Sequence, residues 1–322
     1  MPRTLYLHIG LPKTASTFLQ ERIFTALDNR RVVLMPQNGY FRDEEPERFA
    51  KLLFRRSETI WKDHADDLLH ELFGADWLGG DWRADGRDIL LSDEAIGRAA
   101  SRHSLFAAHL RAMLEALRAR GFSRVKLLCL VRRQDHWIAS HYAQMSDRRA
   151  EASQSDFEDL VDGITDPRRE RYGFGSLLDY ASLHAACCEA LGQENVTFCP
   201  MEWLADPAGD LRSSLARFLE LEDEALDLAE DRVNARRDGG MRWKVRPLRA
   251  HGFGMLRTLK GRPQHIELEP PLSRQILDAY RRSNIELSRR TGLDLETLGY
   301  LGGRRGPSPG EDTQPAKIEA AA

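Results

Sequence analysis

The stretch from Leu5 to Leu27 constrains the fold more than any other part of the sequence. It opens with a short apolar run to Ile9, which Gly10 and Pro12 interrupt, and apolar residues then return at helical spacing. This order predicts a strand, a tight loop and a helix. A helix that starts directly after such a loop presents unpaired backbone N–H groups and the positive end of its dipole, so we expect an anion site there.

The predicted loop carries one lysine and three hydroxyl groups that suit the same anion. Its residues, in order, are Pro12, Lys13, Thr14, Ala15, Ser16 and Thr17. Lys13 adds a full positive charge where the helix begins. The common nucleotide-binding loop has the pattern G-x-x-x-x-G-K-[ST], but here Lys13 follows Gly10 by three residues and no second glycine precedes it. The sequence therefore predicts a phosphate-binding loop of another kind.

This loop resembles the 5′-phosphosulfate loop of sulfotransferases that use 3′-phosphoadenosine 5′-phosphosulfate (PAPS). In that family a strand near the N-terminus leads into P-K-[TS]-x-[ST]-[ST], and residues 12–17 match this pattern in sequence and in position. The resemblance implies a P-loop-like fold of the bacterial sulfotransferase type. It also implies that residues 12–17 bind the 5′ end of PAPS and that Lys13 stabilises the leaving phosphate.

A second anion site is predicted where an apolar strand, residues 125–131, ends in Arg132 and Arg133. An arginine fork binds phosphate oxygens through two parallel hydrogen bonds, and a serine hydroxyl adds a donor. In the sulfotransferase family an Arg at this point and a Ser eight residues later bind the 3′-phosphate of PAPS, and Arg132 and Ser140 have that spacing. The family often has Asp or Asn-Pro after the Arg, so a shared role for Arg133 stays open.

A third feature is the apolar run at residues 89–91 that ends in Ser-Asp-Glu. Ligands of open α/β sheets bind at the carboxyl ends of the strands, so these polar side chains are candidates for chemistry. Sulfuryl transfer needs a base for the acceptor, and the resemblance to family members with S-[SD]-E makes Glu94 the candidate. Asp93, His8 and His103 stay open as alternative bases.

A late basic segment is the last candidate contact with the donor. The family often closes a basic, glycine-containing segment over the 3′-phosphate and adenine, which implies that role for Arg236, Arg237 and Gly239. Nearly every charge from residue 236 to 262 is positive, so an anionic glycan, a lipid headgroup or nucleic acid is an alternative ligand. Trp243 alone does not form a stacking platform for bases, which makes nucleic acid the least favoured of these.

Strand signals that alternate with helical patterns predict a three-layer α/β/α fold with a central, mainly parallel sheet. The strand signals lie at residues 5–9, 31–35, 89–91, 125–131 and 196–199. Residues 1–301 are expected to form one domain, with a final helix at 273–290. The highly charged segment 147–172 is expected to be rich in loops, and the Gly- and Pro-containing residues 302–322 to form a disordered tail.

The net charge of −3 over 322 residues means that anion binding must be local. No apolar run approaches 18 residues and residues 1–4 lead straight into a strand, so we expect neither a transmembrane anchor nor a secretory signal. The four cysteines show neither a disulfide framework nor a C-x-x-C metal spacing. Together these features favour a cytoplasmic protein with free thiols.

These features predict an enzyme that moves a sulfuryl group from PAPS to a hydroxyl or amine acceptor without a required metal, leaving 3′-phosphoadenosine 5′-phosphate (PAP). The alternatives are a P-loop-type kinase or NTPase that uses ATP and Mg²⁺, and a module that binds an anionic nucleotide or glycan without turnover. The missing G-K-[ST] counts against the first alternative, and Lys13 with Glu94 against the second.

A carbohydrate or glycolipid is the favoured acceptor class, and no nucleic-acid partner is expected. Residues 37–85 and 143–175 are expected to frame the acceptor cleft. The aromatic candidates for stacking on a sugar ring are Trp61, Trp77, Trp82, Trp137 and Tyr172.

Overall fold

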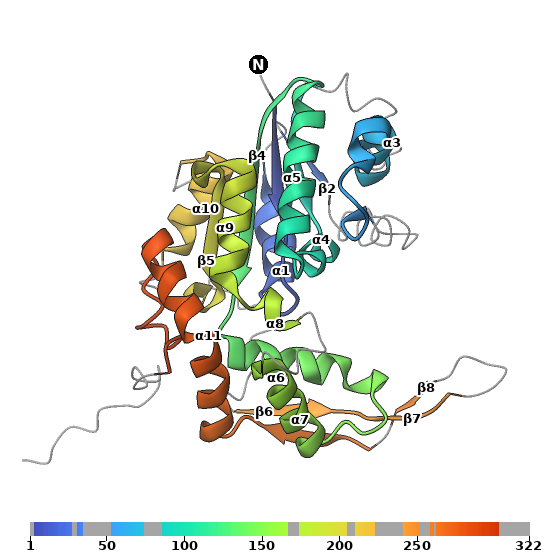
Figure 1. Cartoon of the computed structure of the whole chain (residues 1–322), viewed down its shortest axis with the longest axis vertical. Helices are drawn as coiled ribbons and strands as arrows, with labels where there is room; N and C mark the ends of the chain where they lie inside the picture. Colours follow the sequence, from blue (N-terminus) through green and yellow to red (C-terminus); the bar gives the residue numbers. More distant parts are fainter. Residues whose placement is uncertain are drawn as a thin grey trace, which may run out of the picture.

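The computed structural model has a five-stranded parallel sheet at its centre, in the order β2-β3-β1-β4-β5 (Figure 1). The structure describes residues 3–27, 31–34, 53–73, 86–166, 174–204, 210–222, 241–251, 258–260 and 262–302. The strands are β1 (Arg3–His8), β2 (Arg31–Leu34), β3 (Asp88–Ser92), β4 (Phe122–Val131) and β5 (Val196–Pro200). The prediction of an α/β fold with a mainly parallel sheet is confirmed.

Both faces of the sheet are covered, which explains why its strands are almost wholly apolar. Side chains alternate along β1: Leu5 and Leu7 belong to the larger core cluster, whereas Tyr6 belongs to the smaller one on the opposite face. The larger cluster includes α3 (Ile60–Phe73), α4 (Glu94–Ala99), α5 (His103–Arg118) and α9 (Tyr180–Leu191). The smaller cluster includes the turns that follow β1 and α10 (Leu211–Leu219). The result is the predicted three-layer arrangement.

A second group of elements lies below the carboxyl ends of the strands in Figure 1. It contains α6 (Gln134–Met145), α7 (Gln154–Thr165), the antiparallel pair β6 (Arg242–Val245) and β9 (Gln264–Glu267), and the pair β7 (Leu248–His251) and β8 (Thr258–Lys260). The short α8 (Phe174–Leu177) precedes α9, and α11 (Pro270–Thr291) runs beside both groups. The carboxyl ends of the strands therefore face a second layer of structure rather than open solvent.

The expectation that residues 147–172 are rich in loops is wrong for α7. Ser153 Oγ accepts the N–H of Asp156 at 3.3 Å and caps the helix. Phe157, Val161 and Ile164 then form one buried face. The charged residues between them occupy the exposed face, so high charge content concealed an amphipathic helix.

The basic run from residue 236 to 262 is also more regular than a loop, because β6, β7 and β8 lie within it. Strand β9, which pairs with β6, follows the run directly. Trp243 and Val245 of β6 point into the core. Within the described part of the chain the four cysteines are free thiols, and no described helix has the length and apolar character needed to cross a membrane. The expected tail lies outside the described residues from 303 onward.

Candidate functional site

The backbone of the loop after β1 is shaped to present N–H groups. Lys13 and Ala15 are both left-handed, with φ of 65° and 63°. Left-handed residues alternating with other conformations turn successive N–H groups toward one point, the arrangement of an anion-binding nest. Within the described chain no hydrogen bond uses the N–H of Lys13, Ala15, Ser16 or Thr17. Within the described chain these N–H groups are therefore available as donors.

The side chains of the loop have different roles. Thr14 is fully buried, and its Oγ1 donates to the carbonyl of Leu11 at 2.6 Å, so this hydroxyl closes the turn. Ser16 is also buried, but its Oγ has no partner in the described chain. Since a buried hydroxyl without a partner is destabilising, the Ser16 hydroxyl suits a ligand oxygen. Lys13 and Thr17 are half-buried at the rim.

The helical segment after the loop is not a regular α-helix. It consists of α1 (Ser16–Phe18), a π turn η1 (Leu19–Ile23) and a 3-10 turn η2 (Phe24–Ala26). Single π turns of this kind occur frequently at functional sites. The predicted strand–loop–helix is thus present, with an altered hydrogen-bond pattern after the loop.

Helix α4 packs backbone to backbone against the start of the loop. A Cβ placed on Gly97 would lie 2.7 Å from the carbonyl oxygen of Gly10 and 2.8 Å from that of Ile9. Only glycine allows this approach, because such distances are shorter than real Cβ contacts. The position of α4 is therefore tied to the position of the loop.

Arg132, at the end of β4, reaches the loop directly. Its Nη1 donates to the carbonyl of Lys13 at 3.1 Å, and its own carbonyl accepts the hydroxyl of Tyr180 at 2.7 Å. Burial lowers the pKa of the Arg132 guanidinium, and the nearby Glu202 acts against that shift. No other hydrogen bond of the guanidinium occurs in the described chain. Arg132 therefore keeps donors for an anion beside the loop.

Arg133 is occupied by a different partner. Its Nε and Nη2 donate to the two carboxylate oxygens of Asp135, at 3.2 and 2.7 Å. Ser273 Oγ of α11 donates to the same carboxylate at 2.6 Å. Burial alone would raise the pKa of Asp135, but His136, Arg133 and these hydrogen bonds lower it overall. The Asp135 carboxylate thus joins α6 to α11 and occupies the fork of Arg133, so the shared phosphate role left open for Arg133 is not favoured.

Helix α6 carries two further candidate side chains, of which His141 lies near Lys13 of the loop. The predicted Ser140 is half-buried in its middle, with no hydrogen-bond partner in the described chain. His141 follows it and stacks on Trp137 with ring centroids 4.7 Å apart. Burial, together with the charges of Arg98 and Lys13, lowers the pKa of His141 to about 4. No local sequence pattern predicts the proximity of His141 and Arg98 to Lys13, because it results from the packing of α4 and α6 beside the loop.

The four candidate bases lie in distinct surroundings. Glu94 is half-buried at the first position of α4. Asp93 is 2% exposed and accepts the N–H of Ala95 at 2.7 Å, which makes it the cap of that helix. His8 is fully buried, and burial lowers its pKa to about 3. His103 is half-buried at the start of α5. Accessibility therefore favours Glu94 and His103.

Two of the predicted aromatic residues are buried, and other predicted residues lie outside the described part of the chain. Trp61 and Trp137 are only 3% and 1% exposed, so neither offers a face to a sugar. Three further aromatic candidates and three donor contacts lie outside the described residues: Trp77, Trp82, Tyr172, Arg236, Arg237 and Gly239. The described part of the site thus consists of the loop, the end of β4, the start of α4 and the middle of α6.

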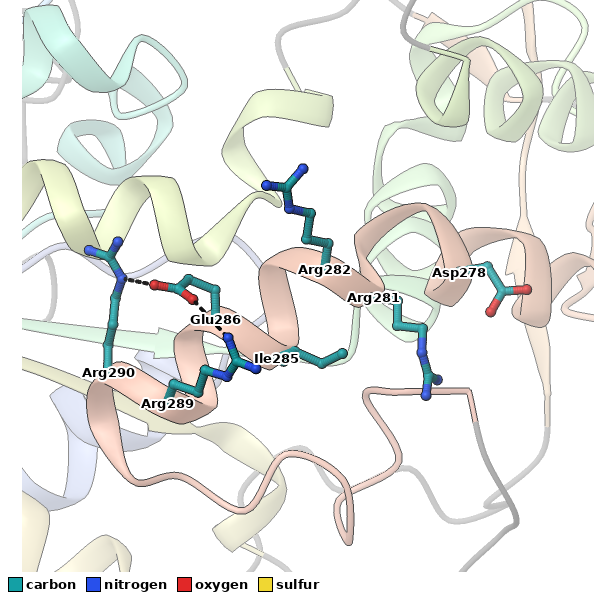
Figure 2. A pocket seen from close by; sticks show the side chains of 7 residues that line it. All are labelled: Asp278, Arg281, Arg282, Ile285, Glu286, Arg289 and Arg290. Carbon is teal, nitrogen blue, oxygen red and sulfur yellow. Dashed lines mark hydrogen bonds and ion pairs between the residues drawn. The ribbon is translucent and has the colours of Figure 1, made fainter.

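Two hollows on the described chain lie away from the loop. One of about 800 Å³ lies along α11, where Figure 2 shows four arginines with Asp278, Ile285 and Glu286. Arg290 and Arg289 approach Glu286 at 2.8 and 3.9 Å, and Arg281 donates to the carbonyl of Leu301. Paired charges on an exposed helix are typical of a solvated face. We place the candidate site at the loop, where buried donors lack partners among the described residues.

Comparisons with known proteins agree with this architecture. No protein-family model matches the sequence, and no curated protein matches it either. Among solved structures, the crystal structure of a sulfotransferase from Alicyclobacillus acidocaldarius is similar, with a TM-score of 0.54 and 13% sequence identity. The match covers 92% of this chain and 98% of that chain. At this identity the likeness shows the fold: a five-stranded parallel sheet with flanking helices, in the P-loop-like arrangement of a sulfotransferase.

Proposed function

We propose that this chain is a sulfotransferase that moves a sulfuryl group from PAPS to a hydroxyl or amine acceptor. The observation that carries the proposal is the hydrogen bond between Arg132 Nη1 and the carbonyl of Lys13, at 3.1 Å. This bond holds the Arg132 guanidinium beside the loop. The guanidinium and the loop N–H groups nevertheless remain two distinct anion-binding groups. Such an arrangement suits a nucleotide with one phosphate at each end of its ribose better than a linear triphosphate. The likeness in fold to a solved sulfotransferase supports the same class.

The residues of the site suit the donor in this proposal. The loop N–H groups and Ser16 Oγ would hold the 5′-phosphosulfate, since buried donors without partners gain hydrogen bonds there. Arg132 and Ser140 would hold the 3′-phosphate through a fork and a hydroxyl. Arg236, Arg237 and Gly239 remain proposed contacts of the 3′-phosphate and adenine.

Transfer then needs one bond to form and one to break. The acceptor oxygen or nitrogen attacks sulfur, and the bond between sulfur and the oxygen of the 5′-phosphate breaks. Glu94 would take the proton of the acceptor, and Lys13 would donate to the departing oxygen as negative charge develops there. The activated donor supplies the driving force, so we propose that no metal is required. The two groups act only if acceptor, sulfur and leaving oxygen lie in line.

The acceptor that we propose is a carbohydrate or a glycolipid in the cytoplasm. The sequence resemblance supports this class. The burial of Trp61 and Trp137 means that any sugar-stacking surface must come from other side chains. A panel of mono- and oligosaccharides, lipid-linked sugars and small hydroxylated metabolites covers the proposed range.

One comparison tests the proposal. The purified protein is offered PAPS with a ³⁵S label and the acceptor panel, in EDTA and in Mg²⁺, and its affinities for PAP and for ATP are measured by calorimetry. We expect PAP binding and label transfer that EDTA does not abolish. ATP hydrolysis that needs Mg²⁺, with no affinity for PAP, would replace the proposal by a kinase or NTPase. PAP binding without label transfer to any acceptor would support a non-catalytic module.

A further inference from the structure

Three buried polar side chains beneath the loop meet at one hydroxyl. His8 ends β1 and Ser92 ends β3, and the two are register partners in the parallel ladder. His8 Nδ1 lies 2.7 Å from Ser92 Oγ. Gln20, in the turn η1 after the loop, donates from Nε2 to the same oxygen at 2.9 Å. Ser92 Oγ therefore joins the strand before the loop, the helical turn after it and the strand that leads to Glu94.

Packing alone does not require polar side chains at these positions. His8 and Ser92 have no exposed surface, and Gln20 is 4% exposed. Burying polar groups carries a desolvation cost that hydrogen bonds offset only in part here, since His8 Nε2 has no partner in the described chain, whereas apolar side chains would fill the same space without that cost. Their hydrogen bonds fix directions and separations that an apolar contact would leave adjustable. This cluster therefore specifies the relative position of the three segments.

The hydrogen bonds also constrain the protons of the cluster. Gln20 Nε2 can only donate, so Ser92 Oγ accepts from it, and one further proton is shared between Ser92 Oγ and His8 Nδ1. The imidazole is neutral, because burial lowers its pKa to about 3. A Cβ on Gly10 would meet Ser16 Oγ at 2.1 Å and His8 Cε1 at 3.1 Å. The ring edge of His8 and the Ser16 hydroxyl thus flank one glycine at the floor of the loop.

We propose that His8, Ser92 and Gln20 are positioning residues for the transfer reaction, which hold the loop at a fixed separation from Glu94 through the shared Ser92 hydroxyl. This inference rests on the proposed function, and none of the three residues touches donor or acceptor. Glu94 follows Ser92 by two residues, so the hydroxyl lies where the base segment and the loop meet. A relative shift of the segments misaligns base and leaving group, whereas the proposed anion contacts lie in the loop, at the end of β4 and on α6 and do not involve the Ser92 segment.

The test begins with Ser92→Ala, which removes the shared hydroxyl. Because a misplacement of 1 Å can cost about 100-fold in rate, we expect kcat to fall roughly 100-fold. The Kd for PAP should stay unchanged, since the loop keeps its own donors. Both quantities are measured well below the melting temperature, so that the protein remains folded. His8→Asn puts an amide at the place of Nδ1, keeps the link to Ser92 and should retain most of kcat.

Two comparisons separate positioning from general stability. His109 is equally buried, accepts Trp61 Nε1 at 2.9 Å on Nδ1 and contacts the carbonyl of Arg56 through Nε2 at 2.9 Å. His109→Asn should therefore lower the melting temperature and leave kcat intact. In a Glu94→Gln background, Ser92→Ala should add little further loss, because both changes affect the same step.

The outcomes are distinct. Full kcat in Ser92→Ala, an equal loss in His109→Asn, or losses of Ser92→Ala and Glu94→Gln that simply multiply would each overturn the positioning role and leave the sulfotransferase proposal standing. A wild-type protein that neither binds PAP nor transfers label overturns both. A selective, non-additive loss of kcat with unchanged PAP affinity supports the positioning role.

Discussion

Arg132 Nη1 donates to the backbone carbonyl of Lys13 at 3.1 Å, although the two residues lie 119 positions apart in the sequence. The bond joins the end of β4 to the loop after β1, two strands that are neighbours in the sheet. Because the acceptor is a backbone atom, the arginine supports the shape of the loop and still offers its other N–H groups to a ligand. The proposed 3′-phosphate and 5′-phosphosulfate sites are therefore linked directly by this hydrogen bond.

Removing this guanidinium should weaken nucleotide binding. A hydrogen bond to a charged group contributes about 2 kcal/mol, so Arg132→Ala should raise the Kd for PAP roughly 30-fold. Calorimetric titration with PAP measures the effect. Arg282→Ala, which removes an arginine from the α11 hollow, is the matched control and should leave Kd unchanged. Equal affinities for both variants would remove Arg132 from the donor site.

Lys13 should act mainly on the rate of transfer. Since it is proposed to stabilise charge on the departing oxygen, Lys13→Ala should lower kcat by about 100- to 1,000-fold, the range for loss of one such donor. Transfer of label from PAPS under saturating conditions measures this change. A variant that loses affinity for PAP but keeps kcat would assign Lys13 to ground-state binding instead.

Glu94→Gln tests the base. The amide keeps the size of the side chain but cannot take a proton, so kcat should fall by about 100-fold or more while the Kd for PAP is retained. His103→Gln is the companion variant, because His103 is the other accessible candidate. If His103→Gln rather than Glu94→Gln abolishes transfer, the role of base passes to the histidine.

Replacing two helical glycines by alanine should have opposite effects, because one of them packs against the loop backbone and the other faces open space. Gly97→Ala puts a methyl group 2.7 Å from the carbonyl oxygen of Gly10, so overpacking should destabilise the protein by about 1–3 kcal/mol and displace the loop. Gly163, in α7, has open space around its Cβ position, so Gly163→Ala should stabilise by roughly 0.5–1 kcal/mol. Urea unfolding measures both changes. A neutral Gly97→Ala with unaltered PAP affinity would contradict the close packing.

Stability should fall as the pH falls from about 6.5 toward 4. Burial lowers the pKa of His184 to about 4 and that of His8 to about 3, and His141 also has a pKa of about 4. Unfolded histidines titrate near 6.5. Between these values the unfolded chain binds more protons than the native one, so the free energy of unfolding rises with pH through this window. Urea midpoints at pH 7.5, 6 and 5 measure the slope.

His184 allows this pH dependence to be traced to one side chain. Its ring packs edge-on against Phe198 and contacts Cys188, away from the loop. His184→Gln removes one of the three histidines and should flatten the slope. A slope identical to that of the wild type would show that other groups control the acid side of the stability curve.

Local patterns predicted the parts of the fold that local forces determine. The strand, the loop and its lysine follow from apolar runs interrupted by Gly10 and Pro12, and the end of β4 from its apolar run before Arg132. Asp93 before a helix carried a capping signal that identifies its structural role. The missed helix α7 also had a signal, in Ser153 and the helical spacing of its apolar residues.

The rest depends on tertiary packing that no local pattern encodes. The central place of β1 in the sheet brings β3 and β4 to its two sides, and this alone sets Ser92 beside His8 and Arg132 beside Lys13. The close contact of Gly97 with the loop backbone fixes the position of α4 and, with it, that of Arg98. Such neighbours follow from the order of strands, which the apolar spacing of single segments leaves open.

The left-handed conformations of Lys13 and Ala15 have a kinetic consequence. Each costs about 1–2 kcal/mol relative to ordinary backbone, and that cost is met when the chain folds, before any nucleotide arrives. A preorganised loop has little conformational entropy to lose on binding. Association should then be limited by diffusion and by the attraction between the anionic nucleotide and the local cations, with an on-rate that falls as salt is added. A loop shaped in advance makes donor capture an encounter rather than a rearrangement.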